Sequence, residues 1–403
     1  LDVARGRPAR GVGVAREPVA GDAPAGRAEP FAAEAVRIIE RWRARRFRSH
    51  DPYDGLETRL VPNAARLPRP VRLALVQLHK RSPVNLRRAF RVPPARNAYA
   101  EGLFASAGLR LWADGHGERL LEAAGECLAW LEAARIRGGW AYPFDVQTKT
   151  FFYPKSTPNV VSTAFAARAF TDAARLAGEA AGATMATEAA RFCVDELLVG
   201  EAGRTWFGYL PGDRGLIHNA NLLAARLCAE AGRLTGDDAL VRIGFDAART
   251  TLADQRPDGA FRYGMGPRLA WIDGHHTGFV VECLADLAAA GFDDATAPLE
   301  RAASFYAREL FTDDGAPRPS PGREHPADAI AAAQGIETFA VLGDAGRAER
   351  IAAWARANLR MPGGSYAFQR GRFHRKSVPY ARWSDAPMAV ALARLAEALR
   401  ARP

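Results

Sequence analysis

The hydrophobic and polar positions of this chain repeat in blocks of two helices. Between about residue 97 and residue 385, a loop rich in aromatic and polar residues runs six times into a helix of small apolar residues, and a more amphipathic helix follows. Self-similarity in units of two helices is typical of an array of helical hairpins. The small-residue helices are expected to start 52 to 61 residues apart, at Asn97, Pro158, His218, His276, Asp328 and Asp385.

Six such hairpins are the number that closes an (α/α)6 toroid. Small residues let the first helices approach closely around a narrow axis, whereas the second helices carry charges on one face, as outer helices do. The sixth hairpin has no second helix, and the amphipathic segment Phe31–Phe47 is expected to supply it. The expected outer helices lie near Glu118–Arg135, Met185–Leu198, Asp238–Asp254, Thr296–Leu310 and Ala345–Leu359.

The predicted fold is therefore all-α, with residues 31–403 forming a single toroid domain and short β-hairpins in its loops. With 48% hydrophobic residues, the chain has ample material for one core. Residues 1–30 are rich in Ala, Gly, Arg and Pro; they lack the apolar stretch of a signal peptide, and we expect them to form a disordered tail. No run of apolar residues is long enough to predict a transmembrane helix.

The four cysteines fall within helical patterns, with no spacing typical of a metal site. We expect buried free thiols, which fit a reducing cytoplasm. They are Cys127, Cys193, Cys228 and Cys283.

The net charge of +10 is concentrated near the start of the chain. Residues 41–100 contain 15 Arg and Lys against Asp51, Asp54 and Glu57. Such a patch attracts an acidic polysaccharide, a diphosphate or an anionic lipid surface, and the alternative is a solvated Arg-rich face. Because Val71–Phe90 mixes apolar and basic residues, contact of 41–100 with the inner face of a membrane stays open. No nucleic-acid-binding motif is present, so nucleic acid is not expected as a partner.

The loops before the inner helices carry the candidate chemistry. The last five each bring an acid near a helix start, and most also bring aromatic, histidine or cationic side chains. Any one acid has an alternative role as a helix N-cap. The candidate catalytic residues are Tyr142, Asp145, Asp213, His218, Asp273, His276 and Tyr380. The candidate substrate-binding residues are Trp140, Lys149, Trp206, Tyr209, Arg214, Asn219, Trp271, His275, Arg370, Arg382 and Trp383.

A cavity that combines aromatic faces with acids, histidines and arginines suits sugars, because rings stack on pyranose C–H faces and planar charged groups bind hydroxyls and carboxylates. Hydrolysis would use two carboxylates. Epimerisation would use a base and an acid on opposite ring faces and a cation for the enolate. Adjacent His275 and His276 point about 100° apart on a helix, and no zinc spacing is present, so no metal or other cofactor is expected.

Three resemblances follow from short motifs. ADQRPDGAF (253–261) resembles the repeat motif of squalene–hopene cyclases and prenyltransferases, which implies a toroid; their D-x-D-D acid is absent. GGWAYPFD, PNVVSTAFAARAF and YARWSD resemble heparosan-type glucuronyl epimerases, which implies that Tyr380 and Arg382 lie near a substrate carboxylate. From DPYDGL to PYARW the chain resembles uncharacterised bacterial toroid proteins associated with surface-polysaccharide biosynthesis.

We therefore predict an enzyme that modifies an acidic or lipid-linked saccharide in a central cavity, with proton-shuttling epimerisation of a uronic acid as the favoured reaction. Three alternatives stay open: a glycoside hydrolase or polysaccharide lyase, a non-catalytic glycan-binding module, and a terpenoid or prenyl-diphosphate enzyme. The last would have a cavity with several Phe and Trp faces and few acids.

Overall fold

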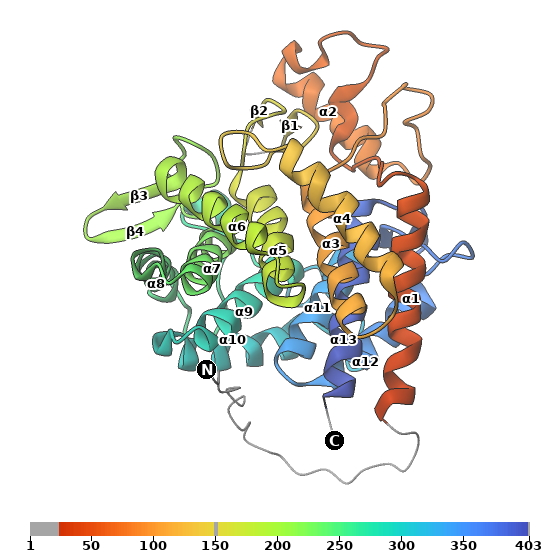
Figure 1. The fold of residues 1–403 in the computed structure, drawn as a ribbon. Coiled ribbons are helices and arrows are strands. Elements are labelled where there is room, and N and C mark those ends of the chain that lie inside the picture. The colour runs from red at the N-terminus through yellow and green to blue at the C-terminus, as the bar shows by residue number, and fades with distance from the viewer. Residues whose placement is uncertain (1–23, 149–151, 402–403) are drawn as a thin grey trace.

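The chain forms an (α/α)6 toroid (Figure 1), as predicted, in a computed structural model that describes residues 24–148 and 152–401. Each inner helix packs against the next, and the last packs against the first, so the ring is closed. The inner helices are α3 (Ala98–Ala113), α5 (Val160–Leu176), α7 (His218–Thr235), α9 (Gly274–Ala289), α11 (Ala329–Val341) and α13 (Ala386–Arg400). The outer helices are α1 (Pro24–Ala44), α4 (Glu118–Ala133), α6 (Ala180–Phe192), α8 (Asp238–Leu252), α10 (Thr296–Glu309) and α12 (Ala345–Asn358).

Helix α1 closes the ring by packing against α13. Trp42 Nε1 donates to Asp385 Oδ2 over 2.8 Å, and the Tyr366 hydroxyl donates to Glu34 over 2.7 Å. Asp385, expected at the start of the last inner helix, thus joins the two ends of the chain. The helix begins at Pro24, so residues 24–30 are helical and do not belong to a disordered tail; residues 1–23 lie outside the described residues.

Short strands and one extra helix lie between the hairpins, on the side of the loops. β1 (Val146–Gln147) pairs with β2 (Phe152–Tyr153), and β3 (Leu198–Glu201) pairs with β4 (Arg204–Phe207), both antiparallel. β5 (Ala327–Asp328), β6 (Gln369–Arg370) and β7 (Arg375–Lys376) form a three-stranded antiparallel sheet. Helix α2 (Arg69–Arg81) stands outside the ring, near β1 and β2 (Figure 1). Short helical turns are η1 (Asp54–Glu57), η2 (Ala64–Arg66), η3 (Cys193–Leu197), η4 (Pro267–Leu269), η5 (Asp293–Ala295) and η6 (Ala381–Asp385).

The four cysteines are buried and unpaired, as predicted. Within the described ranges, no helix has both the length and the apolar character needed to cross a bilayer.

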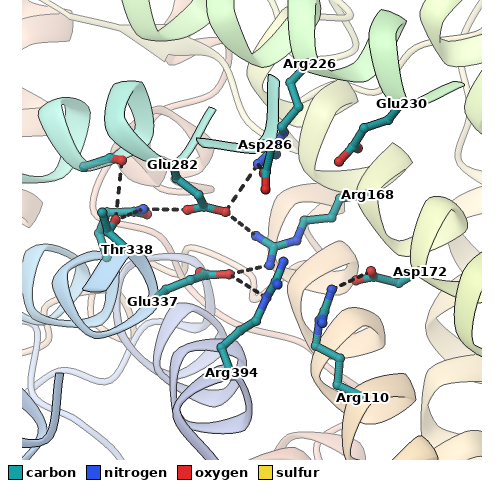
Figure 2. A network of polar contacts seen from close by, with 12 residues as sticks. Arg110, Arg168, Asp172, Arg226, Glu230, Glu282, Asp286, Glu337, Thr338 and Arg394 are labelled. Carbon is teal, nitrogen blue, oxygen red and sulfur yellow. Dashed lines mark hydrogen bonds and ion pairs between the residues drawn. The ribbon is translucent and has the colours of Figure 1, made fainter. Parts of the chain in front are cut away.

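Charged side chains fill the axis of the ring (Figure 2). Arg168 contacts Glu282 at 3.4 Å and also Glu337, while Arg226 lies 3.3 Å from Glu282. At the edge of the network Arg110 pairs with Asp172 at 2.7 Å. Each inner helix contributes at least one charged residue: Arg110, Arg168, Arg226, Glu282, Glu337 and Arg394, with Asp172, Glu230 and Asp286 added by α5, α7 and α9.

Small residues bring the inner helices into backbone contact. A Cβ added to Gly102 of α3 would lie 2.1 Å from the carbonyl oxygen of Phe165 in α5. Such a contact is far shorter than van der Waals distance, so the two helices could not keep their present spacing. This approach explains why the inner helices are rich in Ala and Gly.

We expect Gly102→Ala to lower the free energy of unfolding by about 1–3 kcal/mol, since overpacking forces backbone shifts. Urea unfolding followed by circular dichroism would measure the change. Gly125→Ala on α4 is the matched control, because no atom lies within 4 Å of its added Cβ. The control should be neutral or slightly stabilising through helix propensity. Equal effects of the two substitutions would contradict the close approach.

Candidate functional site

A cavity of about 1000 Å³ opens where the inner helices begin. The residue two positions after the N-cap lines it in α3, α5, α7, α9 and α11, and before the sixth inner helix Arg382 lines it two positions after Tyr380, the N-cap of η6. The loops that precede the helices supply the rest of the wall. The six residues are Tyr99, Val161, Asn219, His275, Ile330 and Arg382.

The wall of the cavity is rich in aromatic side chains. Tyr263 stacks on Trp271 with centroids 4.1 Å apart, and Tyr142 stacks on Phe144 at 5.5 Å. Burial raises the pKa of Tyr263, so its hydroxyl is a neutral hydrogen-bond group. The same holds for Tyr153 and Tyr209. The aromatic lining residues are Tyr53, Tyr99, Tyr142, Phe144, Tyr153, Tyr209, Tyr263, Trp271, Phe279 and Trp383.

Asp273 and His276 form a hydrogen-bonded pair at this wall. Asp273 is the N-cap of α9, where its Oδ1 accepts the backbone N–H of His276 over 2.9 Å. Its Oδ2 lies 2.7 Å from His276 Nδ1. Burial alone would raise the pKa of Asp273, but the attraction of His276 and His275 and the hydrogen bonds from His276 lower it to about 2. The carboxylate is therefore ionised at neutral pH, and it favours the tautomer whose Nδ1–H donates to it and whose Nε2 is free to act as a base.

His275 lies beside this pair, with its ring centroid 3.9 Å from that of His276. Burial, followed by repulsion from His276, lowers the pKa of His275 to about 3, so this ring is neutral. Among the described residues, Asp273, His275 and His276 offer ligand atoms that all lie within 4.8 Å of one another. These three residues could hold a metal ion, because the carboxylate of Asp273, the N-cap of α9, lies close to both imidazole rings.

The cations of the lining are of two kinds. Arg382 is bound by Asp51 through two hydrogen bonds of 2.7 and 2.8 Å, so its charge is balanced, and it lies 4.7 Å from the Tyr142 ring. The others have no carboxylate within ion-pair distance among the described residues; they are Lys80, Arg81, Arg268 and Lys376. No Asp or Glu belongs to the described lining.

The DPYDGL segment positions Arg382 and Tyr380 from below. Asp51 binds Arg382, while Asp54 pairs with buried Arg87 at 2.7 Å. Arg87 Nη1 in turn donates to the Tyr380 hydroxyl over 3.0 Å. Tyr380 is only 2% exposed, so its hydroxyl is engaged outside the cavity.

Eight of the predicted site residues come together in the cavity wall, and Asp273 lies directly behind them. The eight are Tyr142, Tyr209, Asn219, Trp271, His275, His276, Arg382 and Trp383.

The remaining predicted residues do not line the cavity. Trp140 is fully buried and its Nε1 donates to the Leu131 carbonyl, and Trp206 packs between Val199 and Leu216. Asp145 and Asp213 accept backbone N–H groups within their loops, from Lys155 and from Tyr209 and Gly215, respectively. Arg214 pairs with Glu201, and His218 Nδ1 contacts the Thr251 hydroxyl. Arg370 is exposed in β6, and Lys149 lies outside the described residues.

Sequence reasoning missed several lining residues. Tyr99 occupies the position equivalent to Asn219 and His275, so the helix repeat itself carried the signal for it. Tyr53 lies within DPYDGL, a segment ahead of the repeat to which the sequence assigns no role. Lys80 lies in α2, ahead of the repeat, so no repeat pattern could have pointed to it. Lys376 lies in β7, in the loop before the last inner helix, where its positive charge was the only signal.

Comparison with known proteins shows the fold. No family model matches the chain, and no curated protein matches its sequence, so the sequence resemblances to cyclases and epimerases gain no support. The unsaturated glucuronyl hydrolase of Bacillus sp. GL1 is similar in structure, with TM-score 0.65 and 14% identity over 93% of this chain and 98% of that chain. Cellobiose 2-epimerase from Bacillus thermoamylovorans B4167 gives TM-score 0.57 and 11% identity over 75% and 88%. A GH76 α-mannanase from Bacteroides thetaiotaomicron gives 0.58 and 12% over 75% and 85%.

The burial of His218 predicts an acid-sensitive fold. Burial lowers its pKa to about 4, whereas an unfolded chain has a His pKa near 6.5. Below that value the unfolded chain binds a proton that the folded chain excludes, so stability falls as the pH drops from about 6.5 toward 4, by up to about 3 kcal/mol.

We expect His218→Asn to be less stable at neutral pH but to lose this part of the pH dependence. Urea unfolding of both proteins between about pH 7 and pH 5 measures it. His374→Asn, at an exposed histidine, is the control and should keep the wild-type slope. Parallel slopes for wild type and His218→Asn would show that His218 is not held neutral.

Proposed function

We propose that this chain is a saccharide-modifying enzyme in which His276, oriented by Asp273, moves a proton of a sugar bound among the aromatic side chains. The observation that carries the proposal is the 2.7 Å contact between Asp273 Oδ2 and His276 Nδ1 at the wall of a cavity able to hold an oligosaccharide. A cavity histidine whose tautomer is fixed by a carboxylate can act as a general base. The favoured reaction is epimerisation of a uronic acid.

In this reaction His276 Nε2 takes the proton from the carbon next to the sugar carboxylate. The electron pair of the broken C–H bond moves into the carboxylate, forming an enolate whose charge needs nearby cations. A proton then returns to the opposite face of the carbon from the hydroxyl of an acid such as Tyr142. His276 afterwards releases its proton to solvent and the tyrosinate takes one up, so no atom is gained or lost overall. Tyr142 supports this role because it lines the cavity 4.7 Å from the Arg382 guanidinium.

In this proposal the anionic group of the substrate is held by the cations that have no carboxylate partner in the described part of the chain. Lys376 Nζ donates to the Lys80 carbonyl at 3.2 Å and to Gln369 at 3.3 Å, and it has no carboxylate partner among the described residues. Burial, and then the charges of Lys80 and Arg81, lower the pKa of Lys376. A bound carboxylate would relieve this repulsion, whereas Arg382 already has Asp51.

The similar structures support a saccharide as substrate. Two of them are named as an unsaturated glucuronyl hydrolase and a cellobiose 2-epimerase, so the same ring serves both reaction types with sugars. At such low sequence identity the similarity supports only the fold, so the reaction is inferred from the cavity residues.

Hydrolysis is the second candidate, because two acids near α9 and α11 have pKa values shifted in opposite directions. Burial raises the pKa of Asp328 to about 6, whereas that of Asp273 is about 2. One protonated and one ionised carboxyl group are what hydrolysis requires. Against it, Asp328 is engaged as the N-cap of α11 and neither acid belongs to the described lining.

One observation favours the terpenoid alternative: the lining has Phe and Trp side chains and, in its described part, no Asp or Glu. Its six tyrosines, two histidines and Asn219 give it more polar groups than a hydrocarbon needs, which favours a sugar. A glycan-binding module without catalysis would make no use of the Asp273–His276 pair.

We expect Asp273→Asn to slow proton exchange about 10- to 100-fold and His276→Gln about 100-fold or more, because the first loses the tautomer and the second the base. The assay incubates uronic-acid oligosaccharides in D₂O and follows carbon-bound deuterium by mass spectrometry and NMR. Asn remains a good N-cap, so the first variant should keep α9 intact.

New chain ends without deuterium incorporation would favour hydrolysis or elimination over epimerisation. Treatment with EDTA should leave the rate unchanged. A rate lost to EDTA and restored by zinc would assign Asp273, His275 and His276 to a metal ion and overturn the base.

We expect Lys80→Met and Lys376→Met each to raise KM about tenfold or more for a uronate-containing substrate, since each loses a charge-assisted hydrogen bond. The KM for a neutral oligosaccharide should not change. Arg214→Met is the matched control, because Arg214 is exposed and paired with Glu201. Equal loss with both substrates would show that the lysines do not read the carboxylate. Turnover of prenyl diphosphates would support the terpenoid alternative.

A further inference from the structure

In the described part of the chain, the exposed large apolar side chains lie in or next to segments that also line the cavity. Among the described residues, the large hydrophobic side chains that are exposed all lie outside the helices of the ring. Single exposed apolar residues are ordinary, but a set that borders one opening marks an interaction surface. They are Leu60, Val71, Leu78, Val84, Phe152, Met265, Trp271 and Phe373.

Helix α2 contributes an exposed apolar stripe. Val71, Ala74 and Leu78 are exposed and follow one another at helical spacing, while Val76 and His79 are buried against the body of the protein. Leu60, nine residues before the helix, and Val84, three residues after it, are 50% and 61% exposed. In Figure 1, α2 stands beyond the ends of α3 and α4, where no helix of the ring covers it.

The segments that carry these side chains are joined to one another and to the cavity. Lys376 in β7 donates to the Lys80 carbonyl of α2 at 3.2 Å, and the Arg72 guanidinium of α2 lies 4.0 Å from the Phe152 ring in β2. The β6–β7 hairpin ends in Phe373, which is 89% exposed. The loop around Met265 supplies Arg268 and Trp271 to the same cavity wall.

The charge of these segments has one sign. No Asp or Glu occurs between Thr58 and Glu101, or between Glu349 and Asp385. Apolar side chains interspersed with arginines are complementary to the headgroups and upper acyl region of an anionic bilayer. The exposed arginines of these segments include Arg59, Arg66, Arg69, Arg81, Arg88, Arg91, Arg262, Arg268, Arg370, Arg372 and Arg375.

We propose that the mouth of the cavity docks on an anionic lipid surface, with the α2 stripe and Phe373 entering the interface and the arginines binding the headgroups. The cavity then opens toward the bilayer. Together with the proposed function, on which only this clause rests, docking makes a saccharide carried on a membrane lipid the substrate class.

The test is flotation of the full chain with vesicles, without any sugar. We expect binding to an equal mixture of phosphatidylcholine and phosphatidylglycerol, weak binding to phosphatidylcholine alone, and weaker binding as salt is raised to about 0.5 M. The double variant Leu78→Glu/Phe373→Glu should bind the mixed vesicles about tenfold or more weakly. Ala180→Glu/Ala353→Glu, at exposed sites of α6 and α12, adds the same charge and should bind like wild type.

Equal loss in both double variants would mean that net charge alone attracts the chain, and the proposed face would be wrong. Absence of binding to the mixed vesicles would also overturn the proposal, as would a dimer in light scattering that Leu78→Glu/Phe373→Glu dissociates, since a second copy would then cover the face. Because no sugar is present, each of these results leaves the proton-exchange assay of the proposed function untouched.

Discussion

The ion-pair network at the axis of the ring is the constraint on which the rest of the structure depends. Six inner helices converge there, and each brings a charged side chain that is desolvated by the others. A buried charge without a partner is strongly destabilising, so the network stabilises the fold only when all the helices are in register. Attraction by Arg168 and Arg226 outweighs burial and lowers the pKa of Glu282, which keeps this carboxylate ionised.

The register set at the axis also sets the cavity. Arg168, Arg226, Glu282 and Glu337 each lie seven residues after a lining residue of the same helix, which is about 10 Å along an α-helix. A helix that slipped by one turn would therefore displace both its ion pair and its cavity residue. The positions of the aromatic wall and of the Asp273–His276 pair therefore depend on the ion-pair network about 10 Å further along the inner helices.

The same division separates the repeated helices from the elements that lie between them. The inner helices supply the ion-pair network and, in five of them, the lining residue two positions after the N-cap. The segments between the helices, together with α2, supply most of the other lining residues. Asp51 neutralises Arg382, and Lys80 with Lys376 leaves an unbalanced positive charge at the mouth. Much of the exposed apolar surface also lies in these elements, so the proposed docking surface is centred on α2 and the β6–β7 hairpin.

Much of the fold could be predicted from the sequence. The repeat of small-residue and amphipathic helices predicted the closed ring and the closing role of the first helix, because both depend on local periodicity and on the number of hairpins. It also indicated the N-cap role as an alternative for Asp273 and Asp328, which the structure adopts. Local signals of this kind act over a few residues, so they survive without knowledge of the tertiary structure.

The direction in which a loop side chain points was decided only by the tertiary structure. Trp140 and Trp271 lie in similar loops, yet Trp140 is fully buried against Leu131 while Trp271 faces the cavity. His218 and Asn219 are adjacent at the start of α7. Because successive residues of an α-helix are rotated by about 100°, the His218 side chain lies in the core and the Asn219 side chain in the cavity wall. The partner of Arg382 lies more than three hundred residues away at Asp51. The sequence by itself determined the ring and its supply of polar loops, and long-range packing decided which of their side chains meet, because orientation and pairing depend on neighbours that are distant along the chain.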